Sequence, residues 1–242
     1  YIAVYKFPAN SSRIKMKKVM IAVAATLALT AAQAQSDSKW YGIAGLGTAS
    51  VQSDLSDMSA SSGTLTATQT IDTTGNVFFG GVGYQFDDLL AFEAQYMDIR
   101  GFSANQTVTA NNAVVNGTTI NGTFSANQDI KATGLAFSAK YDFKLDSTSK
   151  IYGRVGFTQV KVKNDVAVSG SGTIGGRSAN VVASLSFDET KTVPLFGIGY
   201  EYDLSKQTAL RAEYTHINTV GKQNTTGESS VNMVTLQTKF KF

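Results

Sequence analysis

The sequence contains no cysteine, two prolines and a single histidine, His216. Without cysteine, the chain can form neither a structural disulfide nor a cysteine-ligated zinc site. One histidine among scattered carboxylates also lacks the spacing of metal ligands, so no metal site is predicted. Long apolar runs are missing beyond residue 34, whereas a membrane-spanning helix needs about 20 consecutive apolar residues. These absences exclude a disulfide-stabilised scaffold and disfavour a helical membrane protein.

A basic surface is also missing from most of the chain, although its net charge is +3. Five of the 21 basic residues and none of the 18 acidic residues lie in residues 1–34, so the remainder carries a net charge of −2. No basic patch is left to bind phosphates, and we expect no nucleic-acid partner. The glycine-rich run Gly80-Gly81-Val82-Gly83 lies within a strand pattern rather than at a strand-to-helix turn, so no cofactor is expected.

Residues 16–34 have the pattern of a secretory signal peptide. Met16-Lys17-Lys18 is a short basic start, and an apolar, alanine-rich stretch of residues 19–32 follows. Ala32-Gln33-Ala34 has the small-x-small pattern of a cleavage site. The apolar stretch is too short for a transmembrane helix. We therefore expect cleavage after Ala34.

This interpretation divides the chain into three parts. Residues 1–15 precede an initiator at Met16 and are interpreted as upstream sequence translated in error. Residues 16–34 are the signal peptide. Residues 35–242 form one domain, whose residues carry the rest of the prediction.

Aromatic pairs recur along this domain at the ends of alternating segments. The pairs are Tyr84 and Phe86, Tyr141 and Phe143, Tyr200 and Tyr202, and Phe240 and Phe242. Alternation with a period of two indicates β-strands. A short polar turn follows each of the first three pairs, and another alternating segment begins after it. Together with a first strand near residues 40–51, the count is eight strands.

The connections between these strands alternate in length. Short turns are expected near residues 87, 146 and 205. The intervening segments, 52–75, 104–130, 169–189 and 221–229, are rich in Ser, Thr, Asn and Gly, which predicts loops. Some alternation inside 104–130 and 169–189 leaves room for strands that continue as hairpins. Short turns at one end and long connections at the other are typical of transmembrane barrels.

The two faces of the predicted strands differ in chemistry. One face carries the aromatic pairs and other large apolar residues. The other carries Gly, Ala and Ser with eight charged residues: Glu93, Lys140, Asp142, Arg154, Glu201, Arg211, Glu213 and Lys239. A soluble core could not hold that set, whereas a membrane barrel encloses it and turns its apolar face to lipid. We therefore predict an all-β, eight-stranded, antiparallel, up-and-down transmembrane β-barrel, with Tyr84, Phe86, Tyr141, Phe143, Tyr200 and Tyr202 as its periplasmic aromatic girdle.

On these residues the chain resembles the bacterial outer-membrane barrel superfamily that includes the opacity-type porin family and the membrane domain of outer membrane protein A. The resemblance rests on the leader, the hairpin of residues 194–204, the strand of residues 210–214 and the terminal residues 239–242. It implies the outer membrane of a Gram-negative bacterium, with lipid and lipopolysaccharide around the barrel. It also implies periplasmic chaperones, and a barrel-assembly machinery that recognises the final strand through Phe242 and Phe240. Because the sequence stops at that strand, no peptidoglycan-binding domain is expected.

Three functions remain open at this point. Four acids and four bases in a bore that eight strands leave narrow favour a closed network, hence a structural or surface-interaction barrel that displays polar loops. A ligand on a host or other surface is compatible with those loops, and the sequence names none. The alternative is a narrow or gated porin-like channel for small solutes. A lipid A-modifying enzyme centred on His216 is a distant third, because Asn218 cannot act as nucleophile and no serine lies two residues after the histidine. No catalytic residue is predicted.

Overall fold

The computed structural model describes residues 38–52, 57–222 and 227–242. Every regular element in these residues is a β-strand, and none of them belongs to a helix long and apolar enough to cross a membrane. The strands are β1 (Trp40–Gln52), β2 (Met58–Ser62), β3 (Leu65–Asp72), β4 (Thr74–Gln85), β5 (Leu90–Val115), β6 (Thr118–Lys144), β7 (Ser149–Ile174), β8 (Arg177–Asp203), β9 (Thr208–Lys222) and β10 (Gly227–Lys241). The predicted signal peptide, with Ala32 and Ala34, lies outside the described residues.

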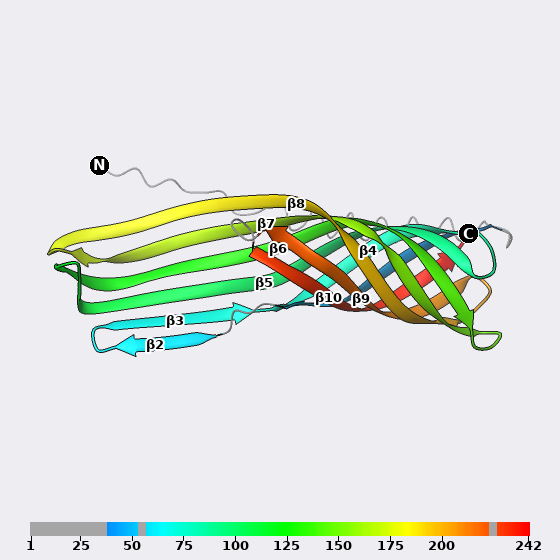
Figure 1. Ribbon diagram of the computed structural model, residues 1–242, viewed down its shortest axis with the longest axis horizontal. Coiled ribbons are helices and arrows are strands. Elements are labelled where there is room, and N and C mark those ends of the chain that lie inside the picture. The colour runs from blue at the N-terminus through cyan, green and yellow to red at the C-terminus, as the bar shows by residue number, and fades with distance from the viewer. Residues whose placement is uncertain (1–37, 53–56, 223–226) are drawn as a thin grey trace.

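Eight of these strands close into a ring (Figure 1). Its order is β1-β4-β5-β6-β7-β8-β9-β10, and all neighbours are antiparallel. The ring closes between β1 and β10, from the pair Tyr41 and Lys241 to the pair Gln52 and Ser230. Closure leaves no free edge in the barrel wall, which hydrocarbon would not tolerate. The prediction of an eight-stranded antiparallel barrel is confirmed.

One end of the barrel has three short turns that share a single mechanism of stabilisation. Asp87 Oδ1 accepts hydrogen bonds from the backbone N–H groups of Leu89 and Leu90, both at 2.8 Å. The Asp146 carboxylate and the Ser205 hydroxyl accept the equivalent N–H groups in their own turns. A polar side chain that binds the backbone two and three residues ahead is a strong turn signal, so these turns follow from local sequence. We call this end the turn end and the opposite end the hairpin end.

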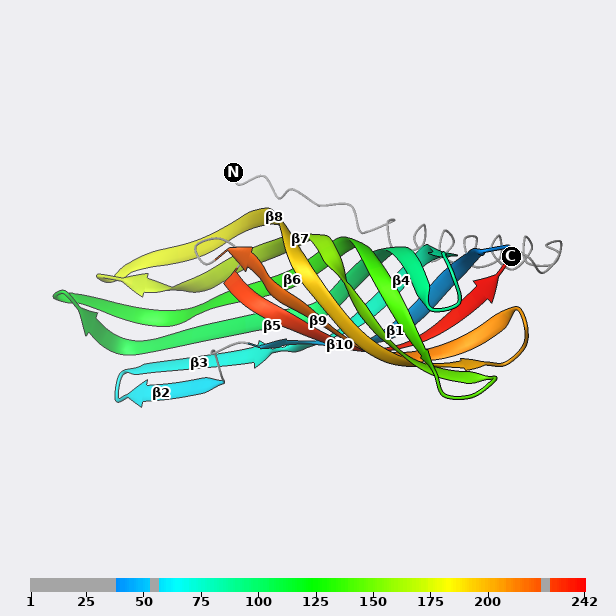
Figure 2. The same cartoon turned by 45° about the vertical axis from the view of Figure 1, so that its right-hand side comes forward.

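The hairpin end differs from the loops that composition predicts for 104–130 and 169–189. Strands β5 and β6 stay paired as far as Val115 and Thr118, and β7 and β8 as far as Ile174 and Arg177. Figures 1 and 2 show these strands running on together well past the ends of β9 and β10. The prediction of loops is therefore wrong for both segments, and the hairpin alternative holds. The ladder formed with neighbouring strands outweighs a composition rich in Ser, Thr and Asn.

Two-residue turns explain how such long hairpins close. The β5–β6 turn consists of Asn116 (φ 49°) and Gly117 (φ 77°), and the β7–β8 turn of Gly175 (φ 57°) and Gly176 (φ 77°). Consecutive positive φ values match the twist of hairpin strands, and glycine or asparagine adopts them at low cost.

The loop predicted for residues 52–75 also contains strands. β2 and β3 form a hairpin, and β3 pairs with the outer half of β5 from Leu65 and Ala110 to Asp72 and Ser103. In the segment 221–229, β9 reaches Lys222 and β10 begins at Gly227. The outer halves of β5, β6, β7 and β8, together with β2 and β3, thus form one sheet that extends from the barrel, which we call the extension.

An arginine in place of Phe157 tests which side of the wall faces lipid. Phe157 is 53% exposed on the outer side of β7, between Ser149 at the turn end and Lys161. In a bilayer, the Phe157→Arg variant is expected to lower the free energy of unfolding by about 2–4 kcal/mol, because the charge enters hydrocarbon. Urea unfolding in phospholipid vesicles measures this change. The Ser171→Arg variant, on the same strand and face but within the extension, should stay within about 0.5 kcal/mol; equal effects of the two variants would contradict an outward lipid face.

The turn at Asp146 predicts a pH dependence. Hydrogen bonds from the Ser149 hydroxyl and from the Thr148 N–H lower the pKa of this carboxyl well below its usual range. The ionised turn therefore stabilises the folded state above the ordinary aspartate pKa of about 3.9, and this stabilisation is lost as the pH falls towards the folded-state value. The urea midpoint of the parent protein should exceed that of the Asp146→Asn variant at pH 7, and the gap should narrow below pH about 4. A gap independent of pH would contradict the assignment.

Candidate functional site

The eight charged residues predicted for the barrel interior are all buried there. Glu93, Lys140, Asp142, Arg154, Glu201, Arg211, Glu213 and Lys239 are each at most 4% exposed. They lie on β5 to β10, at the inward positions of the alternation. The structure brings them into one connected network near the turn end, which we call the lumen network.

Arg211 lies at the centre of this network. Its Nε donates to Glu201 Oε2 at 2.6 Å, and its Nη2 donates to Glu93 Oε1 at 2.8 Å. Glu201 and Arg211 are also directly opposite each other on β8 and β9. The fully buried guanidinium thus bridges two carboxylates from different sides of the barrel.

Arg154 forms a second centre closer to the hairpin end. Its Nη2 donates to Glu213 Oε1 at 2.5 Å, and its Nη1 donates to Gln95 Oε1 at 2.6 Å. Arg154 Nη1 also lies 3.6 Å from Glu93 Oε2, so Glu93 joins the two arginine centres. Planar guanidinium groups suit such bridging, because they offer several donors in fixed directions.

Three lysines surround Glu201 on the side of the turns. Lys239 Nζ is 3.1 Å and Lys150 Nζ 3.0 Å from Glu201 Oε1, and Lys140 Nζ is 3.4 Å from Glu201 Oε2. Lys140 also pairs with Asp142. Sequence reasoning missed Lys150, although its even number places it on the same face of β7 as Arg154.

Two tyrosines complete the network and were also missed. Tyr41 donates to Glu93 Oε1 and Tyr152 donates to Glu213 Oε2, both at 2.8 Å. Lys239 Nζ lies 4.3 Å from the centre of the Tyr41 ring, and the Arg211 guanidinium carbon lies 5.0 Å from that of Tyr152, which favours cation–π attraction. Both rings face the interior, unlike the aromatic residues that were predicted to face lipid.

Glycines provide the space for these rings. A Cβ added at Gly83 would lie 2.2 Å from the Tyr41 ring, and one added at Gly199 would lie 2.4 Å from the Tyr152 ring. Each glycine lies on a strand next to its tyrosine, opposite it in the register. Absence of a side chain is therefore what admits the tyrosine to the narrow bore.

An apolar layer fills the lumen between the lumen network and the hairpin end. Its fully buried members include Val77, Leu195 and Ile217, which pack with Met97, Val160 and other residues of one cluster. The expectation of a polar interior therefore holds only for the half near the turns. A salt-bridged layer and an apolar layer lie in series across the bore.

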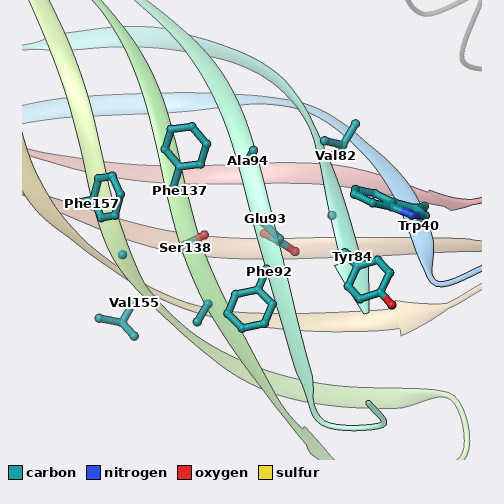
Figure 3. Close-up of a pocket in the computed structure, with 13 residues that line it drawn as sticks. Trp40, Val82, Tyr84, Phe92, Glu93, Ala94, Phe137, Ser138, Val155 and Phe157 are labelled. Atoms are coloured by element: carbon teal, nitrogen blue, oxygen red, sulfur yellow. The ribbon is translucent and has the colours of Figure 1, made fainter. Parts of the chain in front are cut away.

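The predicted aromatic girdle lies at the turn end, on the outside of the wall. Tyr84 is half-buried, and Phe86, Tyr141, Phe143, Tyr200 and Tyr202 are 42–56% exposed. Next to it is a shallow outer groove of about 460 Å³, lined by Trp40, Phe92, Phe137 and Phe157 among others (Figure 3). An apolar groove on this face matches the chemistry of a lipid acyl chain.

The two terminal aromatic residues predicted as an assembly signal are half-buried where the ring closes. Phe240 is paired with Gly42 of β1, and the Phe242 N–H donates to the Trp40 carbonyl at 3.2 Å. The last strand therefore completes the barrel by pairing with the first.

His216 lies on the outward face of β9 near the hairpin end. Its Nδ1 is 2.7 Å from Asn232 Oδ1, which also accepts a hydrogen bond from the Tyr214 hydroxyl. Within the described residues, no serine or threonine hydroxyl is bonded to this histidine. In the same part of the chain, no group of three or more His, Cys, Asp or Glu residues is arranged to hold a metal ion.

Comparisons with known proteins identify the family to which this chain belongs. The family model "Outer membrane protein beta-barrel domain" matches residues 20–242. Outer membrane protein A of Shigella flexneri is 29% identical over 231 residues, which cover 94% of this chain and 56% of that protein. Outer membrane protein A of Klebsiella pneumoniae is 28% identical over 172 residues, with 71% and 42% covered. The chain thus spans about half the length of the curated relatives it matches.

Among solved structures, the chain is similar to the crystal structure of Neisserial surface protein A. That protein is 18% identical, with a TM-score of 0.49, and the match covers 85% of this chain and 98% of the other.

Loss of the central carboxylate tests the lumen network. The Glu201→Gln variant removes the charge that Arg211, Lys239 and Lys150 share, and leaves buried cations undercompensated. We expect the free energy of unfolding to fall by about 3–5 kcal/mol, measured by urea unfolding in vesicles. The Glu189→Gln variant makes the same chemical change in the extension and should cost less than about 0.5 kcal/mol. A similar small effect at Glu201 would show that the network adds little to stability.

Proposed function

Because this chain belongs to the outer membrane protein β-barrel domain family, we propose that it acts as a closed structural barrel that presents a rigid sheet to the cell exterior. The family places it in the outer membrane as a multi-pass β-barrel. One observation carries this proposal. The lumen network and the apolar layer both occupy the bore, while β5, β6, β7 and β8 continue as paired strands beyond the barrel.

The interior supports a structural role over a transport role. The bore contains the lumen network and the apolar layer in series. A hydrated ion would have to separate the pairs around Arg211 and then lose water among residues such as Leu195 and Ile217. Both steps are costly, since buried charges and unsolvated ions are expensive in a low-dielectric interior.

The extension supports a role at the surface. Its outward side consists largely of Ser, Thr, Asn and charged residues. Lys161 pairs with Asp188 at 2.5 Å and Lys163 with Asp165 at 2.8 Å. Two-residue turns close both long hairpins, so few residues are left without a ladder partner. A paired sheet holds its side chains in a fixed array, which suits recognition better than a flexible loop.

The proposal includes the partners of biogenesis and the membrane itself. The outer wall would contact outer-membrane lipid and lipopolysaccharide. Periplasmic chaperones would deliver the unfolded chain to the barrel-assembly machinery. That machinery would recognise Phe242 and Phe240 at the end of the final strand. Residues 16–34 would act as a signal peptide cleaved after Ala34, which leaves residues 35–242 as the barrel domain.

No enzymatic activity is proposed. His216 is bonded to an asparagine and a tyrosine hydroxyl lies nearby, so an oriented hydroxyl nucleophile is lacking among its described neighbours. Unchanged lipid A in cells that overproduce the protein is the expected result, and modified lipid A would favour the enzyme instead.

Site-specific labelling tests the surface role, because the chain has no cysteine of its own. A membrane-impermeant maleimide applied to intact cells should label the Ser178→Cys variant, beside the β7–β8 turn. It should label the Lys206→Cys variant, in a turn at the opposite end, only after the outer membrane is permeabilised. The reverse pattern would overturn the proposed orientation.

Conductance of the purified protein in planar bilayers distinguishes the scaffold from a channel. We expect no steady current, because the salt-bridged lumen network and the buried apolar layer lie in series across the bore. Steady channels that change in the Arg154→Ala variant would replace the scaffold with a narrow pore.

A further inference from the structure

The outer half of β8 has an open edge. From Arg177 to Pro194 this strand pairs with β7 alone, and pairing with β9 begins only at Leu195 and Ile217. Figures 1 and 2 show this part of β8 at the margin of the extension. One side of its backbone therefore presents unused N–H and C=O groups, which another extended strand can complement.

The outer part of this edge, from Arg177 to Phe187, lacks the features that usually protect free strands. Between Arg177 and Phe187 there is no lysine, proline or carboxylate, and the register with β7 is uninterrupted. The side chains of Val182, Leu185 and Phe187 are 83%, 54% and 39% exposed. A long, flat, apolar edge is a surface that binds other strands unless it is blocked.

Two charges on this edge form no ion pair within the part of the chain that the structure describes. Among the charged residues of the outer half of β8, Asp188 pairs with Lys161 and Lys191 pairs with Glu228. Arg177 and Glu189 form no ion pair with any described residue. Both have odd numbers, so they share one face of the strand with Leu185 and Phe187.

The geometry points to a second copy of this chain as the occupant: we propose that two copies pair antiparallel along their β8 edges, centred on Ala183. In this register Arg177 of each copy lies opposite Glu189 of the other, and Val181 lies opposite Leu185. Two cross-strand ion pairs and a continuous apolar face result. A shift by two residues in one direction places Arg177 opposite Lys191, where like charges meet. A shift by two in the other direction places Arg177 opposite Phe187, so both ion pairs are lost.

The relative direction of the two β8 strands determines whether the second copy lies in the same membrane or in a facing one. Figure 1 shows the extension continuing from one end of the barrel along the longest axis of the structure. Because the barrel of this family spans the outer membrane, the extension projects away from the membrane plane. Copies in one membrane are related by rotation about its normal, which leaves their β8 strands parallel. Antiparallel pairing therefore joins copies in two facing membranes, and the inferred activity is homotypic adhesion. This inference rests on the proposed surface role.

Clustering of vesicles tests the inference with a charge exchange. The full-length protein is refolded into phosphatidylcholine vesicles labelled with either of two dyes, and clustering is measured by turbidity and dye coincidence. Parent vesicles should cluster. The Arg177→Glu variant alone and the Glu189→Arg variant alone should cluster about tenfold less or not at all, since each places like charges at both ends of the pairing.

Mixing the two variants supplies the decisive result. Vesicles of the Arg177→Glu variant mixed with vesicles of the Glu189→Arg variant should cluster again, with both dyes in each cluster, because opposite charges then face each other. The Lys206→Glu variant changes the net charge equally at the turn end and should cluster like the parent. A heat-dependent gel shift must show a folded barrel in every sample.

Three results would overturn the inference: parent vesicles that stay dispersed, single variants that cluster like the parent, or a mixture that fails to recover. The maleimide test separates this failure from failure of the proposed function. Surface labelling of Ser178→Cys with dispersed parent vesicles would retain the display role and reject homotypic adhesion.

Discussion

Closure of the backbone hydrogen-bond ladder is the constraint on which the rest of this structure depends. Because β1 pairs with β10, every strand of the barrel has two neighbours and the wall has no edge to satisfy. The side chains are then free to reverse the usual arrangement, with aromatic residues outside and ionic residues inside. Closure is required only where the strands cross the membrane. The extension lies outside that region, and its outermost strands have a hydrogen-bonded neighbour on one side only.

The interior shows how a narrow bore can hold so many charges. Arg211 and Arg154 are each shared between carboxylates, and two tyrosine hydroxyls donate further hydrogen bonds to Glu93 and Glu213. Gly83 and Gly199 make the room for those rings. The lumen network is therefore a property of neighbouring strands and not of any single one. Its placement below an apolar layer is the reason why a structural role agrees with the geometry better than transport.

The outer face of the barrel must be apolar to contact lipid, whereas the outer face of the extension must be polar to contact water. The same long strands meet both requirements. On β7, Phe157 faces outward in the barrel wall, while Lys161 and Lys163 continue the same face above it. The outward residues of β7 therefore change from apolar to charged along the strand, while its pairing with β6 and β8 continues without interruption. The open edge of β8 carries Arg177 and Glu189, which form no ion pair within the described residues, and it is the part of this architecture on which the proposed pairing between copies depends.

The sequence by itself determined the eight strands of the barrel, their antiparallel order, the turn end and the inward position of the charges, because these follow from a period of two and from local turn residues; it did not reveal β2 and β3. Only the tertiary structure decided the rest. Tyr41, Tyr152 and Lys150 enter the network through contacts across strands, and the segments 104–130 and 169–189 become strands because a neighbour completes their ladder. On β5 an irregularity between Ile99 and Phe102 shifts the inward positions from odd to even. The composition of a segment does not predict these contacts, because strand pairing and its irregularities depend on residues that are distant in sequence.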